Sequence, residues 1–461
     1  MGERAKTLER LQEILSRIVG AEWVSKRASY LTVRPGTSEE VSEIVKAANR
    51  TRTPVFPRGA GTGWWSPRQP KPGGLSIDMT RMNGVLVIDE DVMTVTAQAG
   101  ISFIQLETKI GEKGYRLMIF PESGKLGTLG GNIETWGTSP YTSSVFEDQT
   151  TQVVGLKVVL PTGEMIQTGT ASATTAAGQY ARRFFPSDLT GLFVGAESAF
   201  GIITEATLRL YRHSEMIKTR MVEFRDWRSV TAVVRKIQEI QRQRGLLTIV
   251  EQRMMGRDTL LKAIPRLGGI VSDEGNVFLS IRGDGDRIDV ERHVSQACEI
   301  ARSEGGRILD DDVPEWWERR YGLFPENVLS GGPRIMIVAI TPLGRFLEVL
   351  DYTERFCKDR ELAVMMRGYP FGGPVILAHL VIRVEGETAK AREKTLRQAR
   401  KLMEGLMDIG CVPHRVGTDF LPVVAKKLDP TFYGFVKKLK KTLDPRAIMK
   451  PGVVVEEAHR G

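Results

Sequence analysis

Apolar residues along the chain recur with two spacings, one typical of helices and one typical of short strands. Leu8, Leu11 and Leu15 lie three or four positions apart among charged residues, which predicts an amphipathic helix near the N-terminus. Thr37 and Glu40 have the spacing of a capping box and precede another apolar pattern of helical period. We therefore expect a second helix to begin there.

The pattern changes to short strands between residues 75 and 100 and again beyond residue 150. Apolar runs predict strands in this part of the chain at 75–77, 84–88, 92–97, 153–160 and 164–168. A further helix is expected over 101–113. The stretch from Pro121 to about Gln149 is rich in Gly, Thr and Ser and has little periodicity. We expect it to be irregular and to contact a ligand.

After Tyr211 the pattern becomes strand, helix, strand. Three such units are predicted, at 221–250, 277–309 and 334–366. Their strands lack the continuous Val/Ile runs of a buried parallel sheet, which favours an antiparallel sheet with helices on one face. We predict an α+β protein with one domain over residues 1–214 and a second over 215–405, after which residues 406–461 return to the first.

Length and composition indicate a globular protein. The chain has 461 residues, enough for two or three packed units. Hydrophobic residues make up 41% of the chain and charged residues 26%, which are ordinary values. The longest apolar runs have the length of strands, and the N-terminal stretch lacks the apolar region of a signal peptide. These features predict a cytoplasmic protein.

The cysteines and the net charge exclude several classes of protein. Cys298, Cys357 and Cys411 lie far apart without a CxxC pair, which excludes a zinc ribbon, a cysteine-bound iron–sulfur cluster and a disulfide framework. The net charge is +9, with a lysine cluster within residues 437–441. Such a cluster is typical of a solvated helix face, and we expect no nucleic-acid binding. Attraction to an anionic ligand, an acidic redox partner or a membrane surface, with peripheral attachment, remains open.

A glycine-rich loop follows the short apolar run Val55-Phe56. It consists of Pro57, Arg58, Gly59, Ala60, Gly61, Thr62 and Gly63. Glycines allow left-handed backbone and remove the Cβ atoms that would hold a ligand away. Successive N–H groups in such a turn form a concave nest for phosphate oxygens, with Thr62 as a further donor and Arg58 as a nearby charge. The loop alone is equally compatible with an ordinary tight turn.

Six motifs, taken together and in order, match a known family. They are Val33-Arg34-Pro35-Gly36-Thr37, the loop at 57–63, Pro121-Glu122-Ser123 with Thr128-Leu129-Gly130-Gly131-Asn132, GLKVVLPTGE at 155–164, GAESAFGIITEA at 195–206 and DPRAIMKPG at 444–452. On these motifs, nearly the whole chain resembles the FAD-linked oxidases and dehydrogenases of the vanillyl-alcohol-oxidase fold. Within them it resembles the D-2-hydroxyacid dehydrogenases, which act on D-lactate or glycolate.

The resemblance implies a two-part FAD-binding domain of the PCMH type followed by a substrate (cap) domain. It also implies which residues contact the cofactor. These are Pro57, Arg58, Gly59, Ala60, Gly61, Thr62, Gly63, Pro121, Glu122, Ser123, Thr128, Gly130, Gly131, Asn132, Gly137, Glu197, Gly201, Ile202 and Ile203. The first loop continues as Trp64-Trp65-Ser66, with no His or Cys to form a covalent flavin bond. We therefore expect FAD to be bound non-covalently.

Oxidation of a 2-hydroxyacid by a flavin requires a cation for the carboxylate and a base for the hydroxyl proton. Arg319 and Arg415 are the candidates for the cation, because an Arg fork pairs bidentately with a carboxylate. His414 is the candidate for the base or for a group that polarises the hydroxyl. His379 is a further candidate catalytic residue.

A divalent metal is not expected. Relatives of the D-lactate type carry two motifs that the resemblance associates with a metal at the substrate. Here Tyr369 stands in place of one expected His and Pro413 in place of the expected Glu, so at best two of four ligands remain, at His379 and His414. Two side chains are too few for a dedicated closed site.

The resemblance predicts an FAD-dependent dehydrogenase of D-2-hydroxyacids, with D-lactate as the first substrate to test. Electrons would pass to an external acceptor, namely a quinone, a cytochrome or another redox protein. The His414-Arg415 pair also resembles the Tyr-Arg pair of the phenol-oxidising branch, so para-substituted phenols or other alcohols are the alternative substrates. A flavoprotein subunit that requires partner chains is a further alternative. A homodimer is the default assembly.

Overall fold

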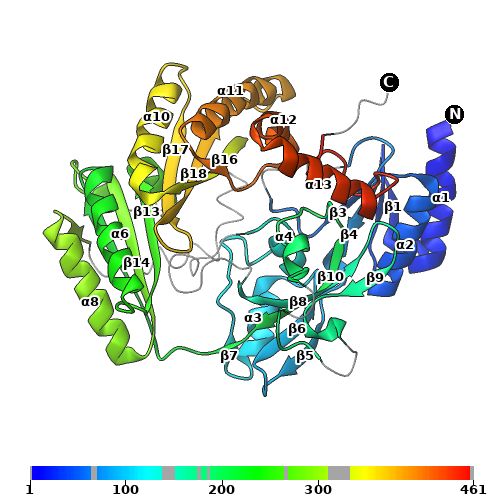
Figure 1. Ribbon diagram of the computed structural model, residues 1–461, viewed down its shortest axis with the longest axis horizontal. Helices are drawn as coiled ribbons and strands as arrows, with labels where there is room; N and C mark the ends of the chain where they lie inside the picture. Colours follow the sequence, from blue (N-terminus) through cyan, green and yellow to red (C-terminus); the bar gives the residue numbers. More distant parts are fainter. Residues whose placement is uncertain are drawn as a thin grey trace.

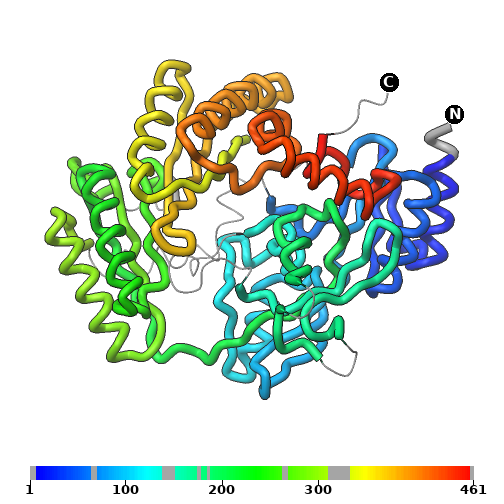
Figure 2. Tube along the Cα trace, viewed as in Figure 1, coloured from blue at the N-terminus to red at the C-terminus, as the bar shows by residue number. Residues whose placement is uncertain are grey.

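The computed structural model of the protein describes residues 3–27, 29–63, 70–137, 151–173, 178–183, 187–263, 268–309 and 333–456. Figures 1 and 2 show two bodies side by side. Residues up to Arg212 form the body on the right, and residues from Met216 to about Lys427 form the body on the left. Of the last two helices, at the top of the view, α12 (Gly417–Lys427) packs on α11 (Ala389–Asp408) of the second body, and α13 (Pro430–Leu443) lies against the first body.

The first body begins with a small sheet of order β1-β2-β4-β3. Its strands are β1 (Val24–Lys26), β2 (Leu31–Val33), β4 (Leu75–Asp78) and β3 (Val55–Arg58), and its helices are α1 (Glu3–Val19) and α2 (Ser38–Thr51). The predicted helix start is confirmed, because the Thr37 hydroxyl accepts a hydrogen bond from the Glu40 N–H. The Glu40 carboxylate accepts from the Gly36 N–H instead of completing the capping box at Thr37.

A second, antiparallel sheet has the order β5-β6-β10-β8-β9. Its strands are β5 (Val85–Asp89), β6 (Thr94–Gln98), β10 (Ile202–Arg209), β8 (Val153–Val159) and β9 (Met165–Gln167), with α3 (Phe103–Gly111) and α5 (Thr190–Phe193) beside them. The short helix α4 (Leu129–Glu134) lies in the stretch that was expected to be irregular. That expectation was wrong there, because Thr128 caps this helix and its side chains Leu129 and Ile133 are buried.

The second body is built on an antiparallel sheet of eight strands, in the order β15-β12-β14-β13-β17-β18-β16-β19. The strands are β15 (Arg307–Ile308), β12 (Met216–Phe224), β14 (Val277–Gly285), β13 (Ile249–Gly256), β17 (Val364–Pro370), β18 (Val375–Arg383), β16 (Arg334–Pro342) and β19 (Val412–Pro413). The helices are α6 (Trp227–Arg242), α7 (Arg257–Ala263), α8 (Arg287–Ser303), α10 (Phe346–Lys358) and α11 (Ala389–Asp408). The predicted antiparallel sheet is confirmed, whereas β18 was not among the predicted strands.

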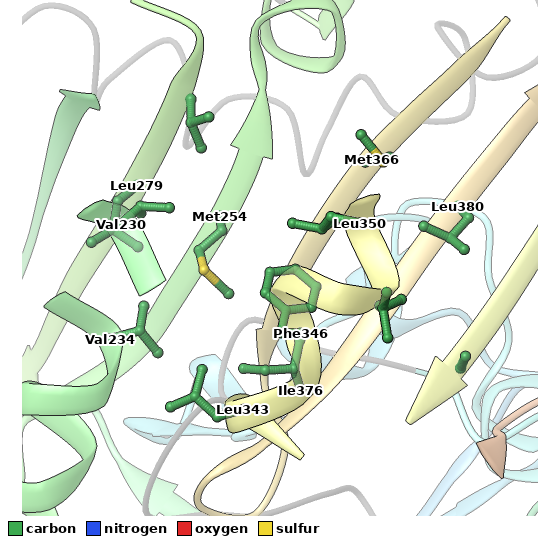
Figure 3. Packing of buried hydrophobic residues seen from close by; sticks show 14 of the residues in the cluster. Val230, Val234, Met254, Leu279, Leu343, Phe346, Leu350, Met366, Ile376 and Leu380 are labelled. Atoms are coloured by element: carbon green, nitrogen blue, oxygen red, sulfur yellow. The ribbon is translucent and has the colours of Figure 1, made fainter. Parts of the chain in front are cut away.

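The main core of this body lies between the sheet and four of its helices. Val230 and Val234 of α6 and Phe346 of α10 pack against strand residues such as Met254 and Leu279 (Figure 3). Side chains of α8 and α11 belong to the same buried cluster. These four helices cover one face of the sheet, as the sequence pattern predicted, whereas α7 packs on the opposite face, where its Leu260 meets Met255 and Phe278.

Polar contacts join the two bodies to each other and attach the end of the chain to the first body. Arg116 of β7 (Tyr115–Arg116) donates bidentately to Asp284 of β14, at 2.6 and 2.7 Å. Its neighbour β11 (Tyr211–Arg212) pairs with β7 just before the chain enters the second body. In α13 (Pro430–Leu443), which follows α12 (Gly417–Lys427), the buried Lys440 donates to the Ala199 carbonyl at 2.7 Å. The C-terminal segment is thereby attached to the first body.

Candidate functional site

The first glycine-rich loop lies directly against the second predicted cofactor segment. A Cβ atom built on Gly59 would lie 1.9 Å from the Thr128 Oγ1 atom, so a side chain at position 59 is excluded unless Thr128 moves. Gly61 has φ +75°, which is the left-handed region that favours glycine. Residues from Gly59 to Gly63 are half-buried, so the loop is neither in the core nor fully in solvent. The two segments form one surface.

The second segment, Thr128 to Asn132, packs closely against neighbouring backbone at its glycines. A Cβ atom on Gly130 would meet the Ala99 Cβ at 2.7 Å, and the Gly130 N–H donates to the Ala99 carbonyl at 2.7 Å. Asn132 is 9% exposed, and its Oδ1 atom has no hydrogen-bond partner within the described ranges. Buried amide oxygens are normally paired, so this atom fits a ligand that supplies a donor. Gly137 donates its N–H to the Asn132 carbonyl.

The third segment, Gly195 to Ile203, is held by a buried carboxyl group of α4. Glu134 accepts hydrogen bonds from the backbone N–H groups of Ser198 at 2.5 Å and Ile203 at 3.3 Å. Burial raises the pKa of Glu134 to about 7, and these hydrogen bonds oppose that rise. Glu197 has φ 49°, and its N–H donates to the Glu134 carbonyl. Three segments that are distant in sequence thus meet around α4.

These features fit an extended dinucleotide such as FAD. Gly59 and Gly130 lie where a Cβ atom would collide with a neighbouring segment, and Gly201 would place one 2.6 Å from Val158 Cγ1. Without side chains, the backbone N–H groups of the first loop can approach pyrophosphate oxygens, whereas those of Leu129 to Asn132 already donate within the protein. The Asn132 Oδ1 atom adds a buried acceptor without a partner among the residues described.

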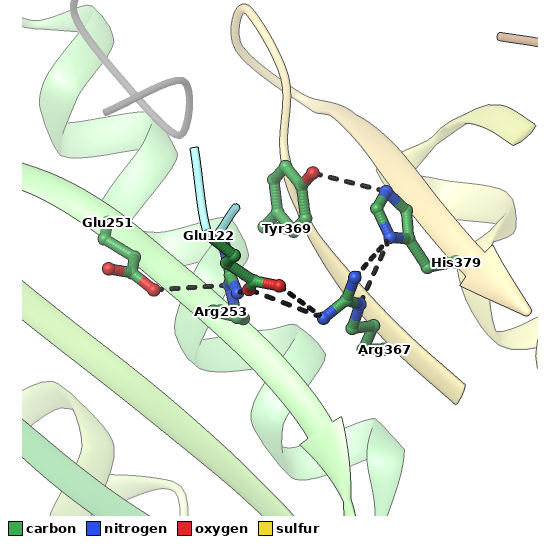
Figure 4. Close-up of polar contacts among 6 residues, drawn as sticks. All are labelled: Glu122, Glu251, Arg253, Arg367, Tyr369 and His379. Atoms are coloured by element: carbon green, nitrogen blue, oxygen red, sulfur yellow. Dashed lines mark hydrogen bonds and ion pairs between the residues drawn. The ribbon is translucent and has the colours of Figure 1, made fainter. Parts of the chain in front are cut away.

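The face of the eight-stranded sheet opposite these four helices carries a largely buried cluster of charged and polar side chains. Figure 4 shows its members Glu251, Arg253, Arg367, Tyr369 and His379, together with Glu122 from the first body. Glu122 forms ion pairs with both Arg253 and Arg367, and its Oε2 atom lies 3.3 Å from Arg367 Nη1. The side chain of Glu122, predicted to contact the cofactor, therefore contacts the arginines of the second body.

His379 is fixed by two neighbours on the same face. Arg367 Nε and Nη2 lie 3.1 and 2.9 Å from His379 Nδ1, and the Tyr369 hydroxyl lies 3.3 Å from Nε2. Arg367 and His379 are directly paired across β17 and β18. Burial, followed by the positive charge of Arg367, holds the pKa of His379 well below its usual value. His379 is therefore a neutral imidazole at neutral pH.

His414 and Arg415 lie at the end of β19, against the first body. The His414 ring packs on Trp136 and Phe371, with centroid distances of 4.7 and 5.3 Å. It is 7% exposed, and neither ring nitrogen has a hydrogen-bond partner in the part of the chain that is described. Burial and the charge of Arg415 lower the pKa of His414 well below its usual value. A neutral ring with a partnerless nitrogen is suited to accept a proton.

Arg415 is equally buried. Its Nη2 atom donates to the Trp136 carbonyl at 2.5 Å, and burial lowers its pKa to about 10. A guanidinium with this pKa is still charged at neutral pH. Since Arg has five N–H donors, the bond to Trp136 is compatible with bidentate binding of a carboxylate.

The structure thus brings three of the four candidate catalytic residues, His379, His414 and Arg415, to one region. Arg319 and the run Trp64-Trp65-Ser66 lie outside the described residues. Arg253 and Arg367 were not among the site residues predicted from the sequence. Each of the two arginines lies within a strand of mostly apolar residues. Since charged residues are rarely buried without a partner, such a position can indicate a buried ion pair.

The described residues contain no group of three or more His, Cys, Asp and Glu side chains that could hold a metal ion. The predicted absence of a metal remains a prediction. Among the helices described, none is long and apolar enough to cross a membrane.

Comparison with known proteins gives two family matches. Residues 30–169 match the family described as FAD binding domain, and residues 213–454 match the family described as FAD linked oxidases, C-terminal domain. The glycolate oxidase subunit GlcD of Bacillus subtilis is 25% identical over 91% of this chain and 87% of its own length. The mitochondrial D-lactate dehydrogenase (cytochrome) of Arabidopsis thaliana is 26% identical over 92% of this chain and 73% of its own length.

A solved structure shares the fold. The 4-ethylphenol oxidase of Gulosibacter chungangensis superimposes with a TM-score of 0.83 and 17% sequence identity, over 99% of this chain and 98% of that enzyme. The predicted two-part α+β architecture of the vanillyl-alcohol-oxidase type is confirmed by this match.

Proposed function

Since this chain belongs to the FAD-linked oxidases, we propose that it binds FAD non-covalently and oxidises a D-2-hydroxyacid, with D-lactate as the first candidate, to the 2-oxoacid. The observation that carries the proposal is the buried His414-Arg415 pair against Trp136. It places a neutral imidazole next to a guanidinium, which are the two groups that the reaction requires. Relatives named as glycolate oxidase and D-lactate dehydrogenase support the substrate class.

The three glycine-rich segments would hold the cofactor. We propose that the backbone of residues 57–63 and the segment at Thr128 to Asn132 bind the pyrophosphate, with Gly195 to Ile203 along the adenosine end. The run from Pro57 to Ser66 contains no His or Cys, which supports non-covalent binding. When bound, FAD supplies an acceptor for the hydride from the α-carbon.

The protein side chains would handle the carboxylate and the proton. Arg415 would bind the carboxylate bidentately, and Arg319 is a second candidate for this task. His414 would accept the hydroxyl proton, because its ring is neutral at neutral pH, although the depressed pKa makes it a weaker base than a free imidazole. His379 has Nδ1 bound to Arg367, so it is less suited than His414 to act as the base. No metal enters this scheme.

An external acceptor would reoxidise the enzyme. A quinone, a cytochrome or another redox protein are the candidates, and the relative named D-lactate dehydrogenase (cytochrome) supports this class. A cytoplasmic location, a homodimeric assembly and the boundaries after residues 214 and 405 remain predictions.

Para-substituted phenols are the second candidate substrates. Trp136 and Phe371 flank the His414 ring, and such aromatic walls suit an aromatic substrate. The fold match to a 4-ethylphenol oxidase, at 17% identity, does not indicate which substrate this chain uses.

Anaerobic flavin reduction tests the proposal. We expect D-lactate to bleach the flavin absorbance of the purified holoenzyme, and L-lactate and 4-ethylphenol not to do so. Arg415→Lys should raise the D-lactate concentration for half-maximal bleaching about 10- to 100-fold, because the fork is lost, with no loss of bound flavin. Arg355→Lys, at an exposed position of α10, is the matched control. Bleaching by 4-ethylphenol but not by D-lactate would overturn the hydroxyacid assignment.

A further inference from the structure

Three side chains form a continuous series on the face of the eight-stranded sheet opposite α6, α8, α10 and α11. Arg367 contacts His379, and His379 contacts the Tyr369 hydroxyl (Figure 4). The Tyr369 and His379 rings meet edge to face, with centroids 5.4 Å apart. Tyr369 is 1% exposed and His379 is 2% exposed, so water does not compete for these bonds.

The direction of each hydrogen bond follows from the chemistry of the groups. A guanidinium only donates, so His379 Nδ1, which two Arg367 nitrogens approach, must be an acceptor. A neutral imidazole carries one N–H, which is therefore on Nε2 and donates to the Tyr369 oxygen. Both ring nitrogens are then occupied, so His379 has no lone pair for a metal ion. The phenolic proton of Tyr369 is not used by His379 and is available to another acceptor.

The strand register places this series beside His414. His379 pairs with Val338 across β18 and β16, and the Val338 carbonyl accepts the His414 N–H at 2.9 Å. His379 and His414 therefore lie in one row across the strands, with a single strand between them, and their backbones are about 10 Å apart. Phe371 packs against the buried cluster that contains Tyr369, and its ring centroid lies 5.3 Å from that of His414, which places Tyr369 beside the proposed site.

Resting on the proposed function, we infer that Tyr369 contacts the substrate: its O–H donates a hydrogen bond to the oxygen on the carbon that is oxidised. His379 and Arg367 are positioning residues that fix the direction of this donor. In the proposed oxidation His414 would take the hydroxyl proton and the C–O bond would become a carbonyl, while bound FAD would supply the acceptor for the α-hydrogen and its electron pair. Tyr369 keeps its proton and stabilises the negative charge that develops on this oxygen.

Nitrogen NMR tests the hydrogen-bond series without any substrate. The chain has five histidines, and the His379 signals of ¹⁵N-histidine-labelled holoenzyme are identified by their loss in His379→Gln. We expect a protonated Nε2 and an unprotonated Nδ1 that do not change between pH 6 and 8. In Arg367→Gln the two tautomers should interconvert. A protonated Nδ1 in the wild-type protein would overturn the inference.

Flavin reduction kinetics test the role of Tyr369. Tyr369→Phe should lower the limiting rate of flavin reduction by D-lactate about 10- to 100-fold at unchanged flavin content, since one hydrogen bond to a developing charge is lost. The matched control is Tyr433→Phe, another buried tyrosine with a hydrogen-bonded hydroxyl, on α13. Equal rates for Tyr369→Phe and wild type would overturn the contact with substrate.

Conservative variants separate positioning from simple packing. His379→Gln retains an N–H donor for the Tyr369 hydroxyl and should keep most of the flavin reduction rate. The shorter side chain of His379→Asn can contact Arg367 but not Tyr369, so this variant should lose as much rate as Tyr369→Phe. If both variants lose rate equally, the role of His379 is packing and the inference fails. If D-lactate does not bleach the wild-type flavin, the proposed function fails separately, and the NMR result still decides the hydrogen-bond series.

Discussion

At the scale of single residues, Glu134 links the stability of the fold to pH. Its carboxyl group is buried under the segment Gly195 to Ile203, and burial raises its pKa from 4.5 to about 7. A raised native pKa means that the folded protein binds the proton more tightly than the unfolded chain. The resulting stabilisation is complete below about pH 4.5 and is lost as the pH rises through 7.

The first prediction concerns this group. Between pH 5 and 8 the free energy of unfolding of the wild-type protein should fall relative to that of Glu134→Gln by roughly 3 kcal/mol, because Gln does not titrate. Urea unfolding at several pH values measures the difference. Glu239→Gln, at an exposed position of α6, is the control. Parallel pH profiles for wild type and Glu134→Gln would contradict the assignment.

A second prediction concerns Gly59. Gly59→Ala should weaken FAD binding about 10- to 100-fold, since a Cβ atom 1.9 Å from Thr128 Oγ1 forces the two segments apart. Titration of the apoprotein with FAD, followed by flavin fluorescence, measures the affinity. Gly344→Ala, whose Cβ atom would meet nothing within 4 Å, controls for the substitution itself. Unchanged affinity in Gly59→Ala would remove this loop from the cofactor site.

Some site residues are readable from the sequence and others are not. His414 and Arg415 are adjacent in the chain, so their pairing is visible in the sequence, and the structure places both in a buried position. Arg253 and Arg367 are isolated arginines that meet Glu122 only because β13 and β17 are neighbours. Register between strands distant in sequence is not encoded in any local pattern, which is why these residues were not selected.

At the scale of elements, α13 fastens the end of the chain. Lys440 is buried and donates to the Ala199 and Met449 carbonyls and to the Asp444 carboxylate. Asp444 in turn accepts the N–H groups of Ile448 and Met449. Of the lysines within 437–441, this one is structural, while the other three are exposed, as expected for a solvated helix face.

The third prediction follows from these bonds. Lys440→Met should lower the free energy of unfolding by about 3 kcal/mol, because two buried carbonyls and a buried carboxylate lose their donor. Lys441→Met, at the exposed neighbouring position, should change it by less than about 0.5 kcal/mol. Denaturant unfolding of both variants provides the comparison. Similar stabilities would show that the buried amine is not essential to this attachment.

The helices and strands were predictable wherever one face is buried and the other is solvated. The strand–helix–strand units of the second body are confirmed, with strands that begin or end a few residues beyond the predicted limits. β18 was not predicted, because its apolar run is continuous and contains His379, so its period does not distinguish a strand. The short helix α4 was missed because six residues carry too little periodicity to be recognised.

At the scale of the whole molecule, Arg116 and Asp284 join the two bodies. The pair is almost completely buried and bidentate, and Ser214 also donates to Asp284. Breaking a buried ion pair by removal of one charge is costly, because the other charge stays buried without compensation. The relative placement of the flavin segments and the polar sheet face therefore depends on this contact.

The fourth prediction tests this dependence. Asp284→Asn should destabilise the protein by about 3–5 kcal/mol and make the chain between the bodies, near Ser214, more sensitive to limited proteolysis. Asp289→Asn removes an exposed ion pair with Arg292 and should have an effect below about 1 kcal/mol. If the two variants resist protease equally, the buried pair does not hold the bodies together.

The attachment of the C-terminal segment also determines the order of events during synthesis. The Val55 N–H bonds to the Ile448 carbonyl, and Arg446 donates to the Asn49 carbonyl across 397 positions of the chain. A ribosome translates from the N-terminus, so the first body emerges long before the residues that complete its β3 edge. The nascent sheet must keep this edge open, or have it shielded by a chaperone, until the residues up to Ile448 have emerged from the exit tunnel.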